Sequence, residues 1–309
     1  MNFKKTYEKY VEYVSMKLKP TSISSITSRF NSYILPYFKD YNIEDITPII
    51  YLKWQDEINE KRLSYRYKKS LHYSLVSFYS YLDLFLNYKN NIPKKVGNFR
   101  NDDIPKEIKI WNYEEFKKFI NSFSNEDFIY KVFFVCLFHT GCRLGECLAL
   151  TFNDLNDNSI FINKTISKEK FGNDKLFTTP KTKNSIRHIK IDNYLIELFN
   201  LLKEYYFNKF GYFDDDFYIF GGIKTLSISS IERRKKKYTD MAGLDYIRIH
   251  DFRHSNATFL IQNNIPIIEV SRRLGHSDIN ITIKTYTHLT NEYEKKVLDT
   301  FNSIHNYNI

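Results

Sequence analysis

The 309-residue sequence contains few cysteines: Cys136, Cys142 and Cys147, all in one segment. Their spacing matches no zinc-binding pattern, and an odd, small number argues against a disulfide framework and indicates a reducing compartment. Long apolar runs are also missing. The longest, Val132 to Phe138, is far too short to span a bilayer, and no basic-then-apolar signal peptide follows Met1. The sequence therefore predicts a cytoplasmic protein that does not enter a membrane.

A third shortage concerns acidic residues. The chain has 46 Lys and Arg against 36 Asp and Glu, a net charge of +10, and its motifs lack the carboxylate cluster that would hold Mg²⁺. Residues 1–105 carry 17 basic residues against 11 acidic ones, and the remainder carry 29 against 25. An excess shared in this way fits a polyanion that contacts both halves. By itself, it also fits many proteins that never bind nucleic acid.

Residues 1–90 predict helices only, because Leu, Ile, Tyr and Phe recur there at three- and four-residue spacing. Hydroxyl residues in Pro20-Thr21-Ser22 and Leu63-Ser64 are typical of helix starts. Roughly four helices would make a small independent bundle. The periodic segments are Tyr7–Leu18, Ile23–Tyr37, Ile49–Ile58 and Tyr67–Leu86.

The helical pattern breaks between Lys89 and Lys109, where polar, basic and proline-punctuated residues are typical of a linker. We therefore expect a helical domain over residues 1–95, a linker over 96–108 and a second domain over 109–309. The second domain opens at Asn112, and Glu115 three residues later predicts a capping box.

Within the second domain, helical periodicity continues to about Leu150 and resumes after Asp192, reaching residue 304. Between these points, alternating apolar positions predict three short strands with polar turns. The fold class is thus mainly α, with a helical N-terminal domain and a mixed α+β second domain containing a small antiparallel sheet. The strands are Ser159–Ile166, Lys175–Thr179 and Ile186–Ile191, and the turns are Gly172-Asn173-Asp174 and Lys183-Asn184-Ser185.

Two arginines are the first candidates for chemistry. Arg143 and Glu146, like His250 and Arg253, stand three residues apart on predicted helices, so each pair projects from one face. A guanidinium group presents a planar fork of donors that matches two phosphate oxygens. Two such groups could hold a phosphodiester and stabilise the charge of its transition state, a task often given to metal ions. The pattern predicts metal-free phosphate chemistry.

Tyr286, ten residues after His276, is the candidate nucleophile. A phenol has a pKa of about 10 and must lose its proton to attack, helped by a histidine or by the field of the arginines. The leaving oxygen needs a proton in return, and Lys181, on the turn between two predicted strands, could supply it. Lys183 is its nearest competitor for that role.

Simpler interpretations stand beside these. Tyr286 is one of 25 tyrosines and could be a packing residue. His250 and His276 could be hydrogen-bonded core histidines. His188 and His254 are predicted to be structural, whereas His288 could either position the tyrosine or lie exposed.

The motifs resemble those of the tyrosine recombinases, the phage and transposon integrase superfamily. Those of the second domain are TGCRLGE, TPKTKNSIRHI, HDFRHSNAT, RRLGHSDI and TYTHL, while KPTSI, ILPYF and DIT in the first are similar to the family's core-binding domain. The ten-residue step to Tyr286 looks like phage and conjugative-transposon integrases. The resemblance assigns Glu146 a role in orienting an arginine or histidine. It assigns six active-site positions to Arg143, Lys181, His250, Arg253, His276 and Tyr286.

This resemblance implies a site-specific DNA recombinase that needs no cofactor. Its tyrosine would form a 3′-phosphotyrosine and free a 5′-hydroxyl, and four protomers on paired double-stranded DNA sites would exchange strands through a Holliday junction. An accessory excision factor could take part. Two alternatives share the scaffold: a catalytically silent DNA-binding regulator, and a relaxing enzyme like the type IB topoisomerases.

Basic side chains outside the catalytic motifs are candidate DNA contacts, with a solvated face as the alternative interpretation. One cluster lies at the start of the fourth predicted helix, and a denser run begins at Arg233. The apolar stripe of Asn291–Ile304 could pack on its own domain or on a neighbouring protomer. The predicted contacts are Lys61, Arg62, Arg66, Lys68, Lys69, Lys183, Arg233 and Arg234.

Overall fold

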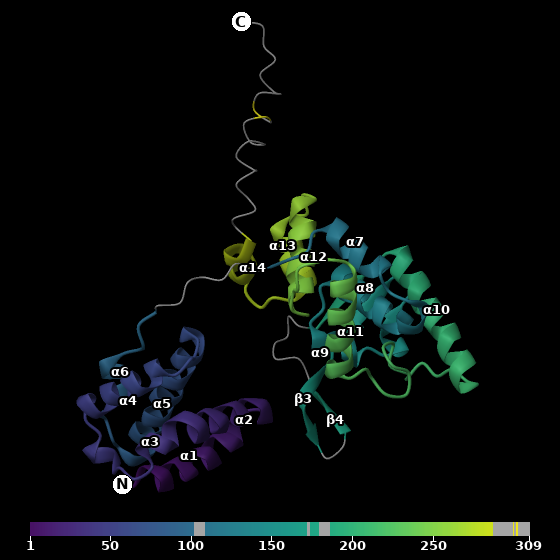
Figure 1. Ribbon diagram of the computed structural model, residues 1–309. Helices are drawn as coiled ribbons and strands as arrows, with labels where there is room; N and C mark the ends of the chain where they lie inside the picture. Colours follow the sequence, from purple (N-terminus) through teal and green to yellow (C-terminus); the bar gives the residue numbers. More distant parts are fainter. Residues whose placement is uncertain (102–108, 172–173, 179–185, 287–298, 300, 302–309) are drawn as a thin grey trace, which may run out of the picture. The chain divides into compact units, whose positions relative to one another are not determined.

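The computed structural model describes residues 1–101, 109–171, 174–178, 186–286, 299 and 301. The chain divides into two compact units, Met1–Glu107 and Ile108–Ile309 (Figure 1). Each unit has its own buried apolar core. Within the described residues, no helix combines the length and the apolar character that crossing a bilayer would require.

The first unit consists of helices, as its sequence predicts. A π-helical turn, Phe30–Ile34, joins α2 to α3, and a 3₁₀ turn, Ile43–Asp45, precedes α4. The predicted segment Ile23–Tyr37 is therefore two α-helices with a wider turn between them. The helices are α1 (Phe3–Lys17), α2 (Pro20–Arg29), α3 (Leu35–Phe38), α4 (Pro48–Glu60), α5 (Tyr65–Leu86) and α6 (Ile92–Val96).

Side-chain caps fix where two of these helices begin. Ser64 accepts a hydrogen bond from the backbone N–H of Tyr67, so the predicted hydroxyl cap of α5 is confirmed. The predicted cap at Thr21 and Ser22 is wrong. Pro20 is the first residue of α2, where its missing N–H costs nothing, and Thr21 and Ser22 already lie inside the helix.

The sequence interpretation, in which regular helical structure ends at Lys89, is wrong for residues 92–96. They form α6, which packs on α4 and α5, and Ile92 is fully buried in the core of the first unit. Asn91 caps this helix by accepting from the backbone N–H of Lys94. This short helix could not be predicted from the sequence, because its surroundings are polar and a single buried isoleucine gives no periodic signal.

The second unit is a helical domain with two small sheets. Its capping box, predicted from Asn112 and Glu115, is confirmed at the start of α7 by reciprocal bonds of 2.9 and 2.8 Å. Two 3₁₀ turns, Asn125–Asp127 and Phe152–Asp154, lie before α8 and β1. The helices are α7 (Tyr113–Asn121), α8 (Phe128–Thr140), α9 (Leu144–Ala149), α10 (Asn193–Phe210), α11 (Ile228–Met241), α12 (Asp251–Gln262), α13 (Ile267–Leu274) and α14 (Ile279–Tyr286).

Both sheets are antiparallel. One has the order β1-β2-β5, with Ile160 opposite Ile189, and the other is the hairpin β3-β4. The single predicted strand Ser159–Ile166 is wrong, because it divides into β2 and the start of β3, which belong to different sheets. The strands are β1 (Leu155–Asn156), β2 (Ser159–Ile162), β3 (Thr165–Phe171), β4 (Asp174–Thr178) and β5 (Arg187–Lys190).

The core of the second unit is built around α8, whose residues from Val132 to Phe138 are all buried. The longest apolar run of the sequence is thus the central helix of a domain core. Helices α7, α9, α10 and α12 all contact α8. This packing places the C-terminal end of α8 beside α12, where the candidate site lies.

Candidate active site

Arg143 and Arg253, the two arginines predicted to bind phosphate, converge on the ends of two helices. Arg253 donates from Nη1 to the carbonyl oxygen of Gly141 (2.8 Å) and from Nη2 to that of Leu274 (2.7 Å). Arg143 donates from Nη2 to the carbonyl oxygen of Gly275 (3.3 Å). These carbonyls lie at the C-terminal ends of α8 and α13, where helix carbonyls lack partners and attract cations. The two helix ends therefore hold both guanidinium groups.

Glycines make this approach possible. Gly141 ends α8 with φ of 65° and Gly275 ends α13 with φ of 68°, a left-handed conformation that favours glycine. A Cβ at Gly141 would lie 2.6 Å from Leu274 and 2.7 Å from Asn256. The first glycine of the TGCRLGE motif thus allows the two helix ends to meet.

Arg253 is only 3% exposed. Burial, followed by the charge of Arg143, lowers the pKa of Arg253 to about 9, so the guanidinium is still protonated at neutral pH. The two acceptors named above are uncharged carbonyls. The charge of Arg253 therefore remains available to an anion, and a bound phosphate would relieve the repulsion from Arg143.

Glu146 holds Arg143 through two hydrogen bonds. Its Oε1 accepts from Nη1 of Arg143 (2.7 Å), and its Oε2 accepts from the backbone N–H of the same residue (3.0 Å), which begins α9. Glu146 is 3% exposed. Although burial would raise its pKa, Arg187 and then Arg143 hold the pKa of this carboxyl below its usual range. The carboxylate is therefore ionised and fixed between two arginines.

Arg187 is a member of this network that the sequence analysis did not single out. Its Nη2 donates to Oε2 of Glu146 (2.9 Å), and its Nε donates to the carbonyl oxygen of Arg273 (2.7 Å). On β5, Arg187 shares the buried side of the strand with Ile189, while His188 and Lys190 face outward. In the sequence, Arg187 stands two residues before Ile189, on the apolar side of the predicted strand. That position was the signal that could have identified Arg187 as buried. Arg187 ties β5, α9 and α13 together.

Replacing Arg187 with Met should destabilise the protein by about 3 kcal/mol, because Glu146 would stay buried with one guanidinium partner fewer. A carboxylate with a lowered pKa stabilises the fold above its unfolded pKa and loses that contribution as the pH falls through its folded pKa. The difference from wild type should therefore shrink at acidic pH. Urea unfolding at several pH values measures it.

The matched control is Arg272→Met, which removes an ion pair with Glu269 whose two side chains are 69% and 49% exposed. Solvated pairs contribute little, so this variant should unfold close to wild type. Equal losses in Arg187→Met and Arg272→Met would contradict the role assigned to the buried network.

Both predicted active-site histidines lie at this site. His276 follows the end of α13, and its Nδ1 is 2.6 Å from Oγ1 of Thr282, which is fully buried. Burial, then Arg253, lowers the pKa of His276 to about 4. His250, at the start of α12, is exposed over part of its surface, and the partial burial of its ring, then His254, lowers its pKa to about 4 as well. Both rings are neutral at pH 7.

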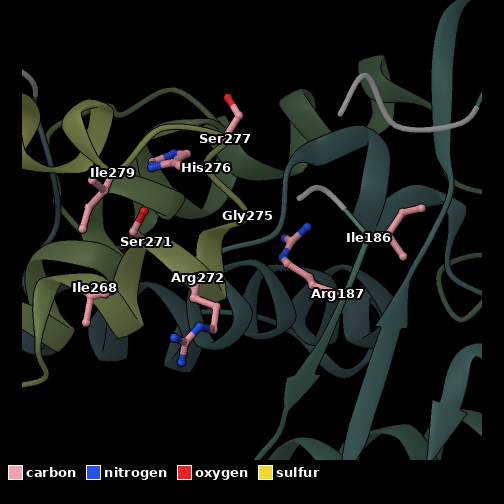
Figure 2. A pocket seen from close by; sticks show the side chains of 9 residues that line it. All are labelled: Ile186, Arg187, Ile268, Ser271, Arg272, Gly275, His276, Ser277 and Ile279. Carbon is pink, nitrogen blue, oxygen red and sulfur yellow. The ribbon is translucent and has the colours of Figure 1, made fainter. Parts of the chain in front are cut away.

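A cavity of about 480 Å³ lies beside His276 (Figure 2). In Figure 2, α13 and the residues that follow it form one wall, and Arg187 and Ile186 project from the opposite side. His276 therefore borders open space. The lining residues are Ile186, Arg187, Ile268, Ser271, Arg272, Gly275, His276, Ser277 and Ile279.

Tyr286, the predicted nucleophile, is the last residue of α14 and is 3% exposed. Its ring packs in a small apolar cluster with Ala257, Ile261 and Val270. Its hydroxyl lies 2.7 Å from Nδ1 of His254, a histidine that the sequence analysis treats as structural. Burial raises the pKa of Tyr286, and Arg253 opposes that shift. The signal for His254 was its position one helical turn after His250, on the same face of α12.

Some of the remaining candidate catalytic and DNA-binding residues of this domain lie outside the described residues, and others lie on α11. Lys181, Lys183 and His288, and the stripe of residues 291–304 except 299 and 301, lie outside the described residues. On α11, Arg233 is exposed, whereas Arg234 pairs with Asp127 (Nε to Oδ1, 3.0 Å) and lies over the ring of Tyr130. Arg234 thus holds α11 against the start of α8.

The predicted DNA contacts of the first unit gather at the start of α5. Lys68 is half-buried and donates to Oδ1 of Asn59 (3.0 Å). The ammonium group of Lys61 lies 6.0 Å from the ring centre of Tyr33, and Lys69 lies 5.9 Å from that of Tyr73. The start of the helix therefore carries a basic surface backed by aromatic rings. The exposed members are Lys61, Arg62, Arg66 and Lys69.

Comparison with known families gives a match over each unit. The model of the phage integrase family matches residues 110–293, which contain every described residue of the candidate site. The model of the phage integrase N-terminal SAM-like domain matches residues 2–59.

Curated relatives match over almost the whole chain. The ICEBs1 integrase of Bacillus subtilis is 31% identical over 96% of this chain and 81% of its own length. A tyrosine recombinase described as XerC-like, from Caldanaerobacter subterraneus, is 28% identical over 95% of this chain and 80% of its own length.

Solved structures share the fold. The Tn1549 transposon integrase, in complex with a circular intermediate DNA, aligns with a TM-score of 0.80 at 18% identity, covering 97% of this chain and 99% of that one. A lambda integrase dimer bound to a core site aligns with a TM-score of 0.68 at 15% identity, covering 92% and 95%. The chain therefore belongs to the phage integrase family of tyrosine recombinases and is a recombinase.

Proposed function

We propose that this recombinase cuts and rejoins double-stranded DNA at specific sites through a covalent 3′-phosphotyrosine formed by Tyr286. The observation that carries the proposal is the convergence of Arg143 and Arg253 on two helix ends, beside His276 and a buried tyrosine hydroxyl. The Tn1549 integrase in complex with a circular intermediate DNA, and the lambda integrase dimer bound to a core site, support DNA as the partner.

In the first step, Oη of Tyr286 attacks the scissile phosphorus, a P–O bond to the tyrosine forms, and the bond from phosphorus to the 5′-oxygen breaks. Arg143 and Arg253 hold the non-bridging oxygens, whose negative charge grows in the transition state. Arginines placed in this way accelerate phosphoryl transfer by about 10³–10⁵-fold. His250 and His276 complete the ring of donors around the phosphate, and Lys181 protonates the leaving 5′-oxygen.

In the second step, the 5′-hydroxyl of a partner strand attacks the phosphotyrosine and frees Tyr286. The phosphotyrosine conserves the energy of the phosphodiester, so no cofactor is consumed. We propose that a homotetramer on two DNA sites performs these exchanges in turn through a Holliday junction. An accessory excision factor can set the direction.

We propose that the DNA contacts are divided between a helical domain over residues 1–95 and a catalytic domain over 109–309, joined by the linker 96–108. Lys61, Arg62, Arg66, Lys68 and Lys69 would contact phosphates from the start of α5, and Arg233 from α11. The same role is proposed for Lys183, on the predicted turn. Arg234 would contribute less, since it is paired with Asp127.

The test is covalent trapping. A site selected from a randomised duplex library by binding to the protein is rebuilt with a nick beside the scissile phosphate, so that the cleaved end diffuses away. We expect an adduct that survives denaturing electrophoresis and a released strand bearing a 5′-hydroxyl. The proposal would be overturned by a bound site that gives no adduct, or by a released strand bearing a 5′-phosphate.

Mass spectrometry then locates the bond. Trypsin releases the segment from Thr285 to Lys295, which contains both Tyr286 and Tyr293, so fragmentation of this peptide must separate the two. We expect the nucleotide on Tyr286. A nucleotide on Tyr293 would keep the reaction but refute the assignment.

A further inference from the structure

The hydroxyl of Tyr286 is engaged by a histidine that the six predicted active-site positions leave out. Among the described residues, its hydrogen-bond partner is Nδ1 of His254, at 2.7 Å, and the two ring centres are 5.9 Å apart. The Nδ1 of His276 instead forms a hydrogen bond with the hydroxyl of Thr282. In the part of the chain that the structure describes, neither His250 nor His276 therefore hydrogen-bonds to the hydroxyl of Tyr286.

We propose that His254 is the catalytic base that accepts the phenolic proton of Tyr286, while His250 and His276 serve the phosphate. The inference rests on the proposed function, since it deepens the chemistry of that same site. Geometry carries it: a helix face and a buried ring bring the acceptor nitrogen and the reacting oxygen within hydrogen-bond distance.

The packing of the pair supports this role. The ring of Tyr286 packs in the apolar cluster that includes Ala257, Ile261 and Leu274, which places its hydroxyl beside the first turns of α12. His254 is half-buried on α12, one residue after Arg253. The base is therefore built into the same helical turn as the arginine that holds the phosphate.

The proton balance is simple. His254 carries its hydrogen on Nε2, and its Nδ1 accepts the hydrogen bond from the hydroxyl of Tyr286. As Oη forms its bond to phosphorus, the phenolic proton moves to Nδ1 and the ring becomes an imidazolium. The electrons of the breaking bond go to the 5′-oxygen, which takes a proton from Lys181. In the return step the attacking 5′-hydroxyl gives its proton to Lys181, the bond from phosphorus to Tyr286 breaks, and His254 gives its proton back to Oη of Tyr286.

The electrostatic surroundings keep the ring of His254 unprotonated, so that it can accept a proton. Burial lowers the pKa of His254, and the nearby arginines act in the same direction, while the carboxylate of Asp251 opposes them. The ring is thus neutral at pH 7, and Asp251 can stabilise the imidazolium that forms. The charged and titratable groups around the ring are Arg248, His250, Asp251, Arg253, His276 and Tyr286.

The first experiment compares His254→Ala with His254→Asn in single-turnover adduct formation on the nicked duplex. The Asn side chain places an acceptor near the position of Nδ1 but cannot take a proton. We expect both variants to bind DNA as wild type does and to form the adduct about 10²–10³-fold more slowly. An Asn variant that cleaves within a few-fold of wild type would reduce His254 to a positioning residue and overturn the proposal.

A second measurement separates the base from the acid. A duplex with sulfur in place of the scissile 5′-oxygen has a leaving group that needs no proton. It should rescue Lys181→Ala, which lacks the proposed acid, but leave His254→Ala slow. Rescue of His254→Ala by this duplex would place the residue on the leaving-group side and overturn the proposal.

Two controls make these results specific. His188→Asn removes an exposed histidine of the same domain, one stacked on Phe161, and should cleave as wild type does. The wild-type adduct itself tests the proposed function. If wild type forms the adduct and His254→Asn does so equally well, only the further inference fails. Thermal unfolding of each variant confirms that the compared proteins are folded.

Discussion

Replacing Tyr286 with Phe should abolish the covalent adduct, lowering its rate of formation by more than about 10⁴-fold, because the variant lacks the hydroxyl oxygen proposed to attack the phosphorus. The ring would keep its place among Ala257, Ile261 and Val270, so the fold should persist. Loss of the hydroxyl leaves Nδ1 of His254 without its partner, at a cost of about 1 kcal/mol. The measurement is the same trapping assay, with binding followed separately by a gel shift.

Tyr113→Phe is the matched control, because Tyr113 is an exposed tyrosine of the same domain, stacked on Phe259. It should form the adduct at the wild-type rate. Undiminished adduct in Tyr286→Phe would refute the nucleophile. Loss of DNA binding in that variant would instead show that the hydroxyl holds the site together.

Replacing Arg253 with Ala is expected to have the second largest effect. It should slow adduct formation by about 10³–10⁵-fold, since the variant lacks a cation that the empty site holds in place before the phosphate arrives. It should also lower stability by about 1–3 kcal/mol for each carbonyl, of Gly141 and Leu274, that stays buried without a donor. Single-turnover cleavage and urea unfolding measure the two losses.

Arg253→Lys separates these effects. A lysine keeps the positive charge but cannot form two parallel hydrogen bonds, so part of the stability should return while most of the cleavage defect remains. Arg272→Lys, on the exposed side of α13, is the control for the substitution itself. If Arg253→Lys cleaves as fast as wild type, the fork geometry is not needed and Arg253 acts only as a point charge.

The charge of the site explains why these arginines have large expected effects. Arg143 and Arg187 bond directly to the buried carboxylate of Glu146, and Arg253 lies close enough to feel its charge. Burial, and then repulsion from Arg143, lowers the pKa of Arg253. We therefore expect the growing negative charge of a phosphate in its transition state to be stabilised at these guanidinium groups.

Local patterns were readable from the sequence. The capping box of Asn112 and Glu115, the cap at Ser64 and the pairing of Arg143 with Glu146 each join residues three apart, so the helix alone sets their geometry. The division into a helical unit and a mixed unit also followed from periodicity. Periodicity carried too little signal in two places. It did not show α6, which has one buried isoleucine, and it did not show where β2 ends and β3 begins.

Contacts between distant segments needed the fold. Arg187 reaches Glu146 across 41 residues, and His254 reaches Tyr286 across 32. Residue spacing does not predict such pairs. Arg187 meets Glu146 only when β5 lies near α9, and His254 meets Tyr286 only when α14 lies near α12. The sequence by itself determined the candidate catalytic groups of this recombinase: two arginines, two histidines and a tyrosine, in an order that resembles the family's. The tertiary structure decided which histidine hydrogen-bonds to the candidate nucleophile, because the direction of a side chain depends on how the helices pack. The order of residues along the chain does not fix that direction.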